Sequence, residues 1–144
     1  MPPRPKRPLL NSEGEVGIFN RIYQRIPRNQ RQQLQRHHMP STAYLEDHGI
    51  DPNDGVVMLI ETTVNSAGRH NRTHTFRRSR NILARYLGLS PRRALYTDIA
   101  DMRSIFKQDG VYNSQTRSAL LNFIRQSYEQ HTEFFDASRR LRNR

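Results

Sequence analysis

The sequence contains no cysteine, no long apolar run and almost no lysine. Without cysteine the chain has no disulfide, no thiolate zinc site and no cysteine nucleophile, so a metal ion would have to be bound by His, Asp, Glu or Asn. No stretch reaches the roughly 18 consecutive apolar residues of a transmembrane helix. The basic N-terminus MPPRPKRPLL is not followed by the apolar segment of a secretory signal peptide.

Positive charge is the strongest feature of the composition, and nearly all of it is arginine. The 24 Lys and Arg residues against 13 Asp and Glu give a net charge of +11, and Lys6 and Lys107 are the only lysines. The guanidinium group binds phosphate through two parallel hydrogen bonds. The composition therefore favours a polyanionic partner, namely nucleic acid, over a basic surface that merely keeps the protein soluble.

The charge is unevenly distributed along the chain. Residues 1–36 carry a net charge of +6 and residues 76–144 one of +8, whereas residues 37–75 carry −3. Four of the six histidines are gathered in two short segments of this region, RHHMPS (36–41) and GRHNRTH (68–74). A cation site between phosphate-binding arms would give this pattern, and so would an acidic loop region.

We expect a basic, proline-rich, flexible arm at residues 1–13, which could be the remnant of a linker in a longer protein. A core region at 14–90 and a C-terminal helical subdomain with a basic tail at 91–144 follow. Hydrophobic spacing predicts an α+β protein that is mostly helical. The predicted elements are a short helix at 14–26, a strand at 55–64, an amphipathic basic helix at 76–87, a helix at 91–107 with Ser90 as its N-cap, and a last helix at 114–137.

The two histidine clusters are the candidates for chemistry. His70 and His74 are four residues apart, so on a helix both imidazoles would share one face and reach a single ion. His37 and His38 are adjacent and would point in opposite directions in an extended segment, so that one could bind metal while the other acts as a general base. Taken separately, the first cluster is also compatible with a polar turn and the second with a helix surface.

Two histidines, a loop and strand, and then H-x-x-x-H resemble the ββα-metal (His-Me finger, HNH) nuclease motif. The closest pattern is that of the DNase domain of nuclease colicins. The segments His37-His38-Met39-Pro40 and Arg69-His70-Asn71-Arg72-Thr73 also resemble the HH-x-P and [DR]H-x-x-T segments of toxin domains at the C-termini of polymorphic bacterial toxins. The resemblance implies a ββα-metal core with additional C-terminal helices.

The resemblance also implies roles for single residues. His37 would bind a metal ion, His38 would activate the attacking water, and His70 would complete the metal site, with His74 as an optional further ligand. The metal would be one divalent ion, Mg, Zn or Ni. The family's asparagine would correspond to Asn65, with Asn53 as the second choice.

Arginines close to the two clusters are the candidates for phosphate contacts, although solvated arginines on a helix are the ordinary alternative. These candidates are Arg36, Arg69, Arg72, Arg77 and Arg78.

The function implied by the resemblance is a metal-dependent endonuclease (DNase) toxin domain. It would be secreted or delivered as part of a larger toxin and would act in the cytoplasm of the target cell. Its substrate would be DNA, with RNA as a possible substrate, and an acidic immunity protein would neutralise it. Two alternatives stay open from the residues. One is a metal-independent RNase that uses histidine acid–base chemistry, and the other is a non-enzymatic nucleic-acid-binding protein whose histidines merely titrate.

Overall fold

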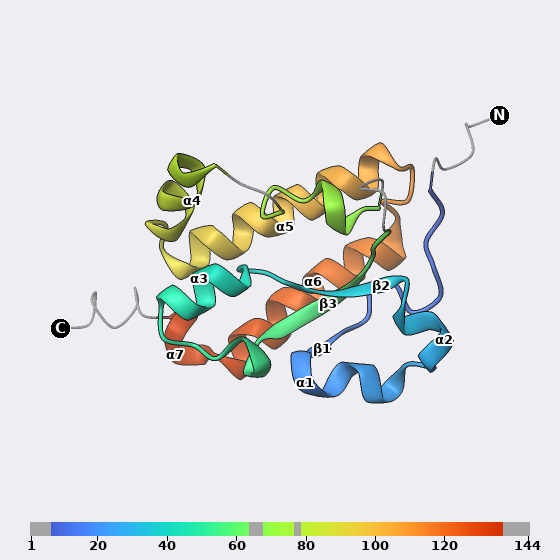
Figure 1. The fold of residues 1–144 in the computed structure, drawn as a ribbon, viewed down its shortest axis with the longest axis horizontal. Coiled ribbons are helices and arrows are strands. Elements are labelled where there is room, and N and C mark those ends of the chain that lie inside the picture. The colour runs from blue at the N-terminus through green and yellow to red at the C-terminus, as the bar shows by residue number, and fades with distance from the viewer. Residues whose placement is uncertain (1–6, 64–67, 77–78, 137–144) are drawn as a thin grey trace.

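A small antiparallel sheet organises the fold. The computed structural model describes residues 7–63, 68–76 and 79–136. Its sheet has the strand order β1-β3-β2, with β1 at Val16–Ile18, β2 at Leu34–His38 and β3 at Val56–Glu61 (Figure 1). The central strand β3 is therefore paired on both sides, whereas β2 is an edge strand.

Helices make up most of the remaining described structure, which confirms the predicted α+β, mostly helical class. The α-helices are α1 (Phe19–Ile22), α2 (Arg28–Arg31), α3 (Thr42–Asp47), α4 (Arg80–Leu87), α5 (Pro91–Gln108), α6 (Ser114–Gln130) and α7 (Thr132–Phe135). The 3-10 helices are η1 (Tyr23–Arg25), η2 (Pro52–Asp54) and η3 (His70–Arg72). None of the helices within the described residues is both long and apolar enough to span a membrane.

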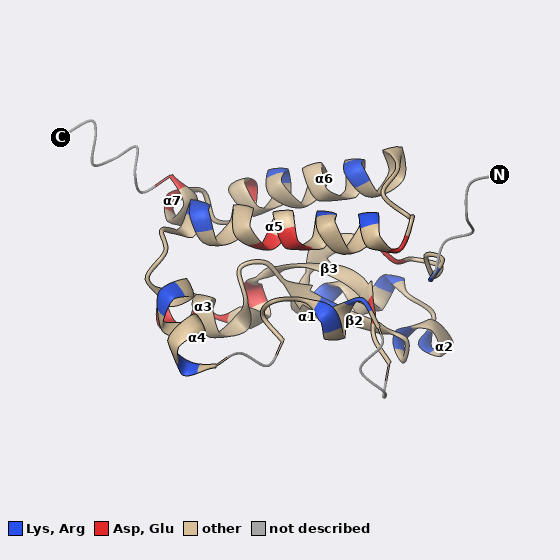
Figure 2. Ribbon diagram, turned by 90° about the horizontal axis from the view of Figure 1, so that it is seen from above, with Lys and Arg blue, Asp and Glu red and all other residues tan. Residues whose placement is uncertain are grey.

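The larger hydrophobic core lies between one face of the sheet and the two long helices. Val56, Met58 and Ile60 alternate along β3, so their side chains share this face. They cluster with apolar side chains of α5 and α6: Leu95, Met102, Phe106, Leu120 and Phe123. Figure 2 shows α5 and α6 side by side on this side of the molecule. Strands from the predicted core region and helices from the predicted C-terminal subdomain thus share one hydrophobic core.

The opposite face of the sheet packs against a short lobe. Val57 and Leu59 of β3 and Leu34 of β2 form a second cluster with Ile22 and Ile26. We call residues 19–33 the arginine lobe, because α1, η1 and α2 carry four arginines and no acidic residue. Since both faces of β3 are covered, all six of its residues are buried.

Helix caps agree with the sequence at several ends. The Ser90 side chain accepts a hydrogen bond from the backbone N–H of Arg93, and Pro91 follows it, so α5 begins where it was predicted. The helix predicted from residue 76 begins only at Arg80, because Ser79 caps it through the N–H of Ile82. The last predicted helix is divided at His131, whose φ of −132° and ψ of 54° are not helical.

The helix predicted at 14–26 was wrong in its first part. Val16 pairs with Met58 and Ile18 with Val56, so this segment forms a strand before α1 begins at Phe19. The local spacing of apolar residues did not show this pairing because the partner strand is about forty residues away in the sequence.

A buried arginine joins the N-terminal segment, the loop after β3 and the end of α5. Arg69 has no exposed surface. Its Nε and Nη2 donate to the two carboxylate oxygens of Glu13 at 2.7 and 2.6 Å, and its Nη1 donates to Oδ2 of Asp109 at 2.9 Å. Nη1 and Nη2 also donate to the backbone carbonyls of Arg7 and Pro8. Residues 7–13 of the predicted flexible arm are therefore held in place.

This location corrects the prediction that Arg69 contacts nucleic acid. A guanidinium that is fully buried and hydrogen-bonded to two carboxylates cannot present itself to a phosphate. The pKa of Asp109 is lowered by the guanidinium groups of Arg72 and Arg69, although burial acts against this shift. Asp109 is therefore ionised at neutral pH.

Replacing Arg69 with Met should lower the free energy of unfolding by about 3–5 kcal/mol, because Glu13 would stay buried without its guanidinium partner and Asp109 would keep only Arg72. The matched control is Arg125→Met, which breaks an exposed pair with Glu129 at 3.8 Å and should cost less than about 1 kcal/mol. Urea denaturation followed by circular dichroism measures both. Equal losses in the two variants would contradict a stabilising role for the buried network.

Candidate functional site

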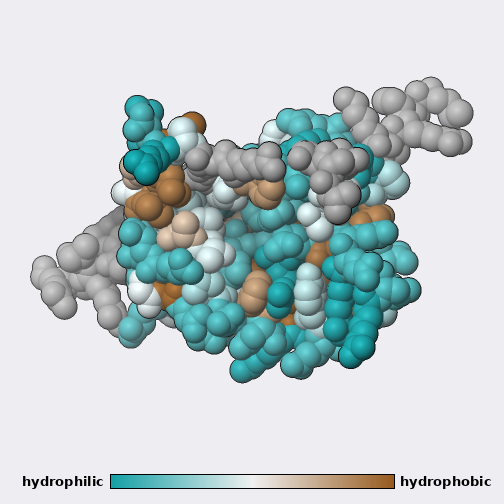
Figure 3. Space-filling model, viewed as in Figure 1, coloured by the Kyte–Doolittle hydropathy of each residue, from teal (hydrophilic) through white to brown (hydrophobic). Residues whose placement is uncertain are grey.

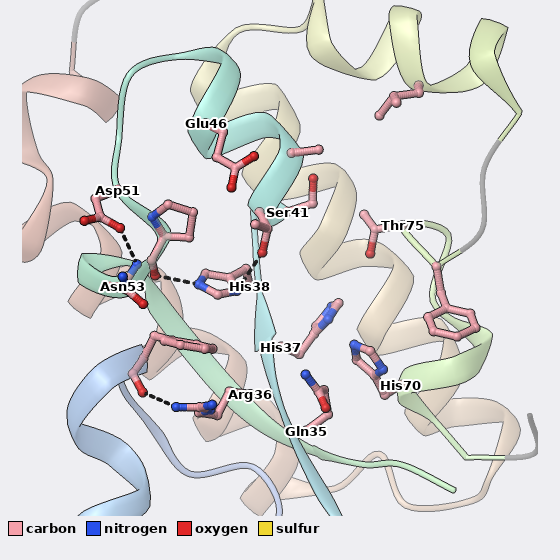
Figure 4. A pocket seen from close by; sticks show the side chains of 16 residues that line it. Gln35, Arg36, His37, His38, Ser41, Glu46, Asp51, Asn53, His70 and Thr75 are labelled. Carbon is pink, nitrogen blue, oxygen red and sulfur yellow. Dashed lines mark hydrogen bonds between the residues drawn. The ribbon is translucent and has the colours of Figure 1, made fainter. Parts of the chain in front are cut away.

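A cavity of about 680 Å³ brings the two histidine clusters together. It lies at the edge strand β2, between α3 and η2 on one side and the segment from η3 to residue 76 on the other (Figure 4). Histidines, other polar side chains and aromatic side chains line it, including Arg36, His37, His38, Thr42, His70, Phe19 and Phe76. In the space-filling view of Figure 3 hydrophilic residues predominate on the surface around it, with an apolar patch over α4, where Ile82 is exposed.

The edge position of β2 explains how both adjacent histidines reach one cavity. His37 pairs with Met58 and lies on the sheet face toward α5, whereas His38 pairs with Val57 and lies on the face toward the arginine lobe. The two rings therefore point in opposite directions, as predicted. His37 points toward His70 (Figure 4), and His38 points toward the carbonyl of Pro52. Because β2 has no neighbour on its outer side within the described residues and ends at His38, the cavity extends past the strand and contacts both faces.

His37 and His70 form a pair of neutral imidazoles. Their ring centroids are 5.1 Å apart and the rings are nearly perpendicular, at 80°. Burial lowers the pKa of His37 well below its usual value, and the neighbouring His70, His38 and His74 lower it further. Burial also lowers the pKa of His70 to about 4. At neutral pH both rings therefore carry a nitrogen lone pair, which is the form that binds divalent metals.

His38 is fixed in one tautomer by its surroundings. Its Nε2 lies 2.8 Å from the carbonyl oxygen of Pro52, which can only accept, so Nε2 carries the proton. Its Nδ1 then has the lone pair and lies 3.2 Å from the hydroxyl of Thr42. Burial lowers the pKa of His38, although the bond to Pro52 acts against this shift. At neutral pH the ring is therefore a neutral imidazole, with the free lone pair on Nδ1.

Arg36 is the predicted phosphate-binding arginine that the structure places at the cavity. Its guanidinium carbon lies 3.7 Å from the ring centroid of Phe19 and 4.2 Å from that of Tyr23, and Nη1 donates to the carbonyl of Phe19 at 3.0 Å. Arg72 instead pairs with Asp109 and does not line the cavity. Arg77, Arg78 and Asn65 lie outside the described residues, whereas Asn53, the second choice for the asparagine, lines the cavity beside Pro52.

His74 does not join the other histidines. Its Nε2 is hydrogen-bonded to Asp98, and its ring packs on Tyr86. The expectation that His70 and His74 share a helix face was wrong, because η3 ends at Arg72 and Thr73 is extended, with ψ of 148°. Among residues 7–63, 68–76 and 79–136, no three His, Asp or Glu side chains converge in a way that would hold a metal ion.

Sequence reasoning missed three residues that define the environment of His38. Pro52 supplies the carbonyl that sets its tautomer, Thr42 faces its Nδ1, and Phe19 stacks on its ring. Ser41 was a signal that could have placed Thr42 at a helix start, since the Ser41 side chain caps α3 through the N–H of Tyr44. Nothing in the sequence marks Phe19, since it reaches the site through tertiary packing.

Comparisons with known proteins leave the site to be interpreted from its geometry. No protein-family model matches the chain, and neither a curated protein nor a solved structure is significantly similar to it.

The buried histidines should make the free energy of unfolding depend on pH. The ordinary pKa of His is 6.5, whereas that of His70 in the folded protein is about 4. Between these values the unfolded chain binds a proton that the folded chain excludes, so stability is complete above 6.5 and falls as the pH is lowered toward 4. Urea denaturation across this range measures the slope.

The variant His70→Gln should show a shallower slope than the wild type, and the control His131→Gln, which changes a partly exposed ring bonded to the carbonyl of Asp54, should not. The pH dependence of Asp109 and other carboxylates is common to all three proteins, so the comparison isolates His70. A slope that His70→Gln leaves unchanged would contradict the buried neutral imidazole.

Proposed function

We propose that this protein is a metal-dependent endonuclease that hydrolyses phosphodiester bonds, with His38 as its general base. One observation carries the proposal. Three of the four clustered histidines line one cavity, and their contacts differ. Nε2 of His38 is hydrogen-bonded to the carbonyl of Pro52, whereas His37 and His70 form a pair of neutral imidazoles. Hydrolysis of a phosphodiester needs a general base and a metal ion, and this site offers a base beside two nitrogens that can bind a metal ion.

The side chains present fit a divalent metal ion. Two neutral imidazoles suit Zn²⁺, Ni²⁺ and related ions, and a set of two protein ligands leaves positions for water and for substrate oxygens. His37 and His70 would hold the ion, without His74. When bound, the ion would act as a Lewis acid on the scissile phosphate.

The ββα-metal assignment is part of the same proposal. It is supported by the antiparallel pair β2–β3, by the histidine pair at the end of β2 and by His70 in the segment after β3. In this chain the segment after β3 is the 3-10 helix η3, and an α-helix begins only at Arg80.

The residues of the chain perform the proton transfer in this proposal. Nδ1 of His38 takes a proton from the attacking water, directly or through the hydroxyl of Thr42, which lines the cavity. The carbonyl of Pro52 accepts from Nε2 throughout and stabilises the imidazolium that forms. Arg36, held by two aromatic rings, is placed to bind a phosphate oxygen.

A metal-independent ribonuclease fits the site less well. Such an enzyme needs one histidine as a base and a second one protonated as an acid. The pKa values of His37 and His70 are both lowered by burial, so neither ring is an imidazolium at neutral pH. The neutral state of this pair favours a metal-ligand role over a role as general acid.

The charge around the cavity fits a polyanion that enters from one side. Residues 19–36 carry five arginines and no acidic residue, and Figure 2 shows basic residues over α1, β2 and α2. The other wall of the cavity carries Glu46 and Asp51 (Figure 4). Three further parts of the same proposal rest on the resemblance. They are DNA as the substrate, delivery by a larger toxin to the cytoplasm of a target cell, and an acidic immunity protein as partner.

Plasmid DNA should be cleaved in the presence of Mg²⁺, Ni²⁺ or Zn²⁺ and not in EDTA. His38→Ala should lower the rate by about 10²–10⁴-fold, the usual contribution of a general base, whereas the control His131→Ala should cleave like the wild type. Agarose electrophoresis over time measures the rates. Cleavage that survives both EDTA and His38→Ala would refute the proposal, and cleavage of RNA alone in EDTA would select the metal-independent ribonuclease.

Metal affinity should depend on two histidines and not on the third. We expect His37→Ala and His70→Ala to lose Zn²⁺ or Ni²⁺ binding in isothermal titration calorimetry, since each removes one of two protein ligands. His74→Ala should retain it, because His74 is bonded to Asp98 instead. Circular dichroism checks that each variant is folded. Loss of binding in His74→Ala alone would place the metal elsewhere.

A further inference from the structure

Four side chains near the cavity form one continuous stack. The rings of His38 and Phe19 are stacked, with centroids 5.0 Å apart and planes inclined by 26°. The guanidinium of Arg36 lies over the ring of Phe19 at 3.7 Å and over that of Tyr23 at 4.2 Å. Phe19 thus contacts both the proposed base and the arginine at the cavity, whereas Tyr23 contacts the arginine.

The strand geometry creates the space that Phe19 fills. Arg36 and His38 are two residues apart on β2, so their side chains leave the same face of the strand with a gap between them. The backbone of Phe19 is held at this gap from two sides. Its N–H donates to the carbonyl of Gly55 at 3.0 Å, and its carbonyl accepts from Nη1 of Arg36 at 3.0 Å.

The ring of His38 is restricted on its other sides as well. Its Nε2 is bonded to Pro52, and a Cβ atom added at Gly55 would lie only 2.9 Å from its Cδ2 atom. The loop from η2 to β3 therefore limits sliding of the imidazole in its plane. What remains is tilting of the ring out of its plane, and the stacked ring of Phe19 opposes that motion.

We propose that Phe19 is a positioning residue that holds the imidazole of His38 in the orientation required for proton abstraction. This inference rests on the proposed function, and it assigns a role to a residue that carries no reactive group. Phe19 is only partly buried. Its ring therefore belongs to the stack with His38 and Arg36 and not to the centre of the core.

The test compares Phe19→Leu with the matched variant Tyr23→Leu. Both remove an aromatic ring from Arg36, but only the first removes the ring from His38. Phe19→Leu should lower kcat by about 10- to 100-fold, the effect of a small misplacement of a catalytic group, and Phe19→Tyr, which keeps the ring, should restore it. Tyr23→Leu should change KM and leave kcat unchanged, since Tyr23 contacts Arg36 and the carbonyl of Leu34 but not His38.

A spectroscopic measurement reports on the stack without any need for activity. The ring protons of His38, assigned by their loss in His38→Ala, should resonate upfield in the wild type because of the ring current of Phe19. They should move downfield in Phe19→Leu and stay in place in Tyr23→Leu. The NMR experiment uses the full chain with EDTA, and circular dichroism confirms that each variant is folded.

Two results would overturn the inference. One is a wild-type kcat in Phe19→Leu, and the other is a loss of kcat while the His38 signals stay in place. The failure of the proposed function looks different, because then the wild type itself cleaves no nucleic acid with any metal while the NMR shifts still show the stacked ring.

Discussion

The buried ion pairs of Arg69 are the interaction on which the rest of the structure depends. One guanidinium, without exposed surface, binds Glu13 before β1, Asp109 after α5 and the backbone of the N-terminal segment. Its own backbone N–H donates to Glu61 at the end of β3. A small protein with a modest apolar fraction is thereby tied together at a point where four segments meet.

The Arg69 junction also fixes the position of one side of the candidate site. His70 directly follows Arg69, so the residue that holds the segment to the sheet also sets where the second histidine cluster begins. The first cluster is fixed independently by the pairing of β2 with β3. Two separate anchors, one ionic and one made of backbone hydrogen bonds, thus bring His37 and His70 within 5.1 Å of each other.

The sequence allowed the class of fold to be predicted, and it singled out three of the histidines that line the candidate cavity, because these signals are local. The apolar run before Glu61, the Ser90-Pro91 cap and the paired histidines can each be read within a few residues. The fate of Arg69 and His74 could not be predicted this way. An arginine beside a histidine resembles a phosphate ligand until the carboxylates of Glu13 and Asp109, some 56 and 40 residues away, are seen around it. Likewise, the spacing of His70 and His74 indicated a helix, but His74 lies in a turn after Thr73, where it is bonded to Asp98.

The carbonyl of Pro52 also constrains how the proposed catalytic cycle can close. Since Nε2 of His38 is already bonded to it, this nitrogen is not available as an exit for protons. A proton that Nδ1 accepts has to leave from Nδ1, on the same side of the ring as the hydroxyl of Thr42. In the proposed enzyme the proton therefore leaves His38 from the same edge of the ring, at Nδ1, that the substrate occupies. Each turnover is complete only when the product has left this edge or has carried the proton away.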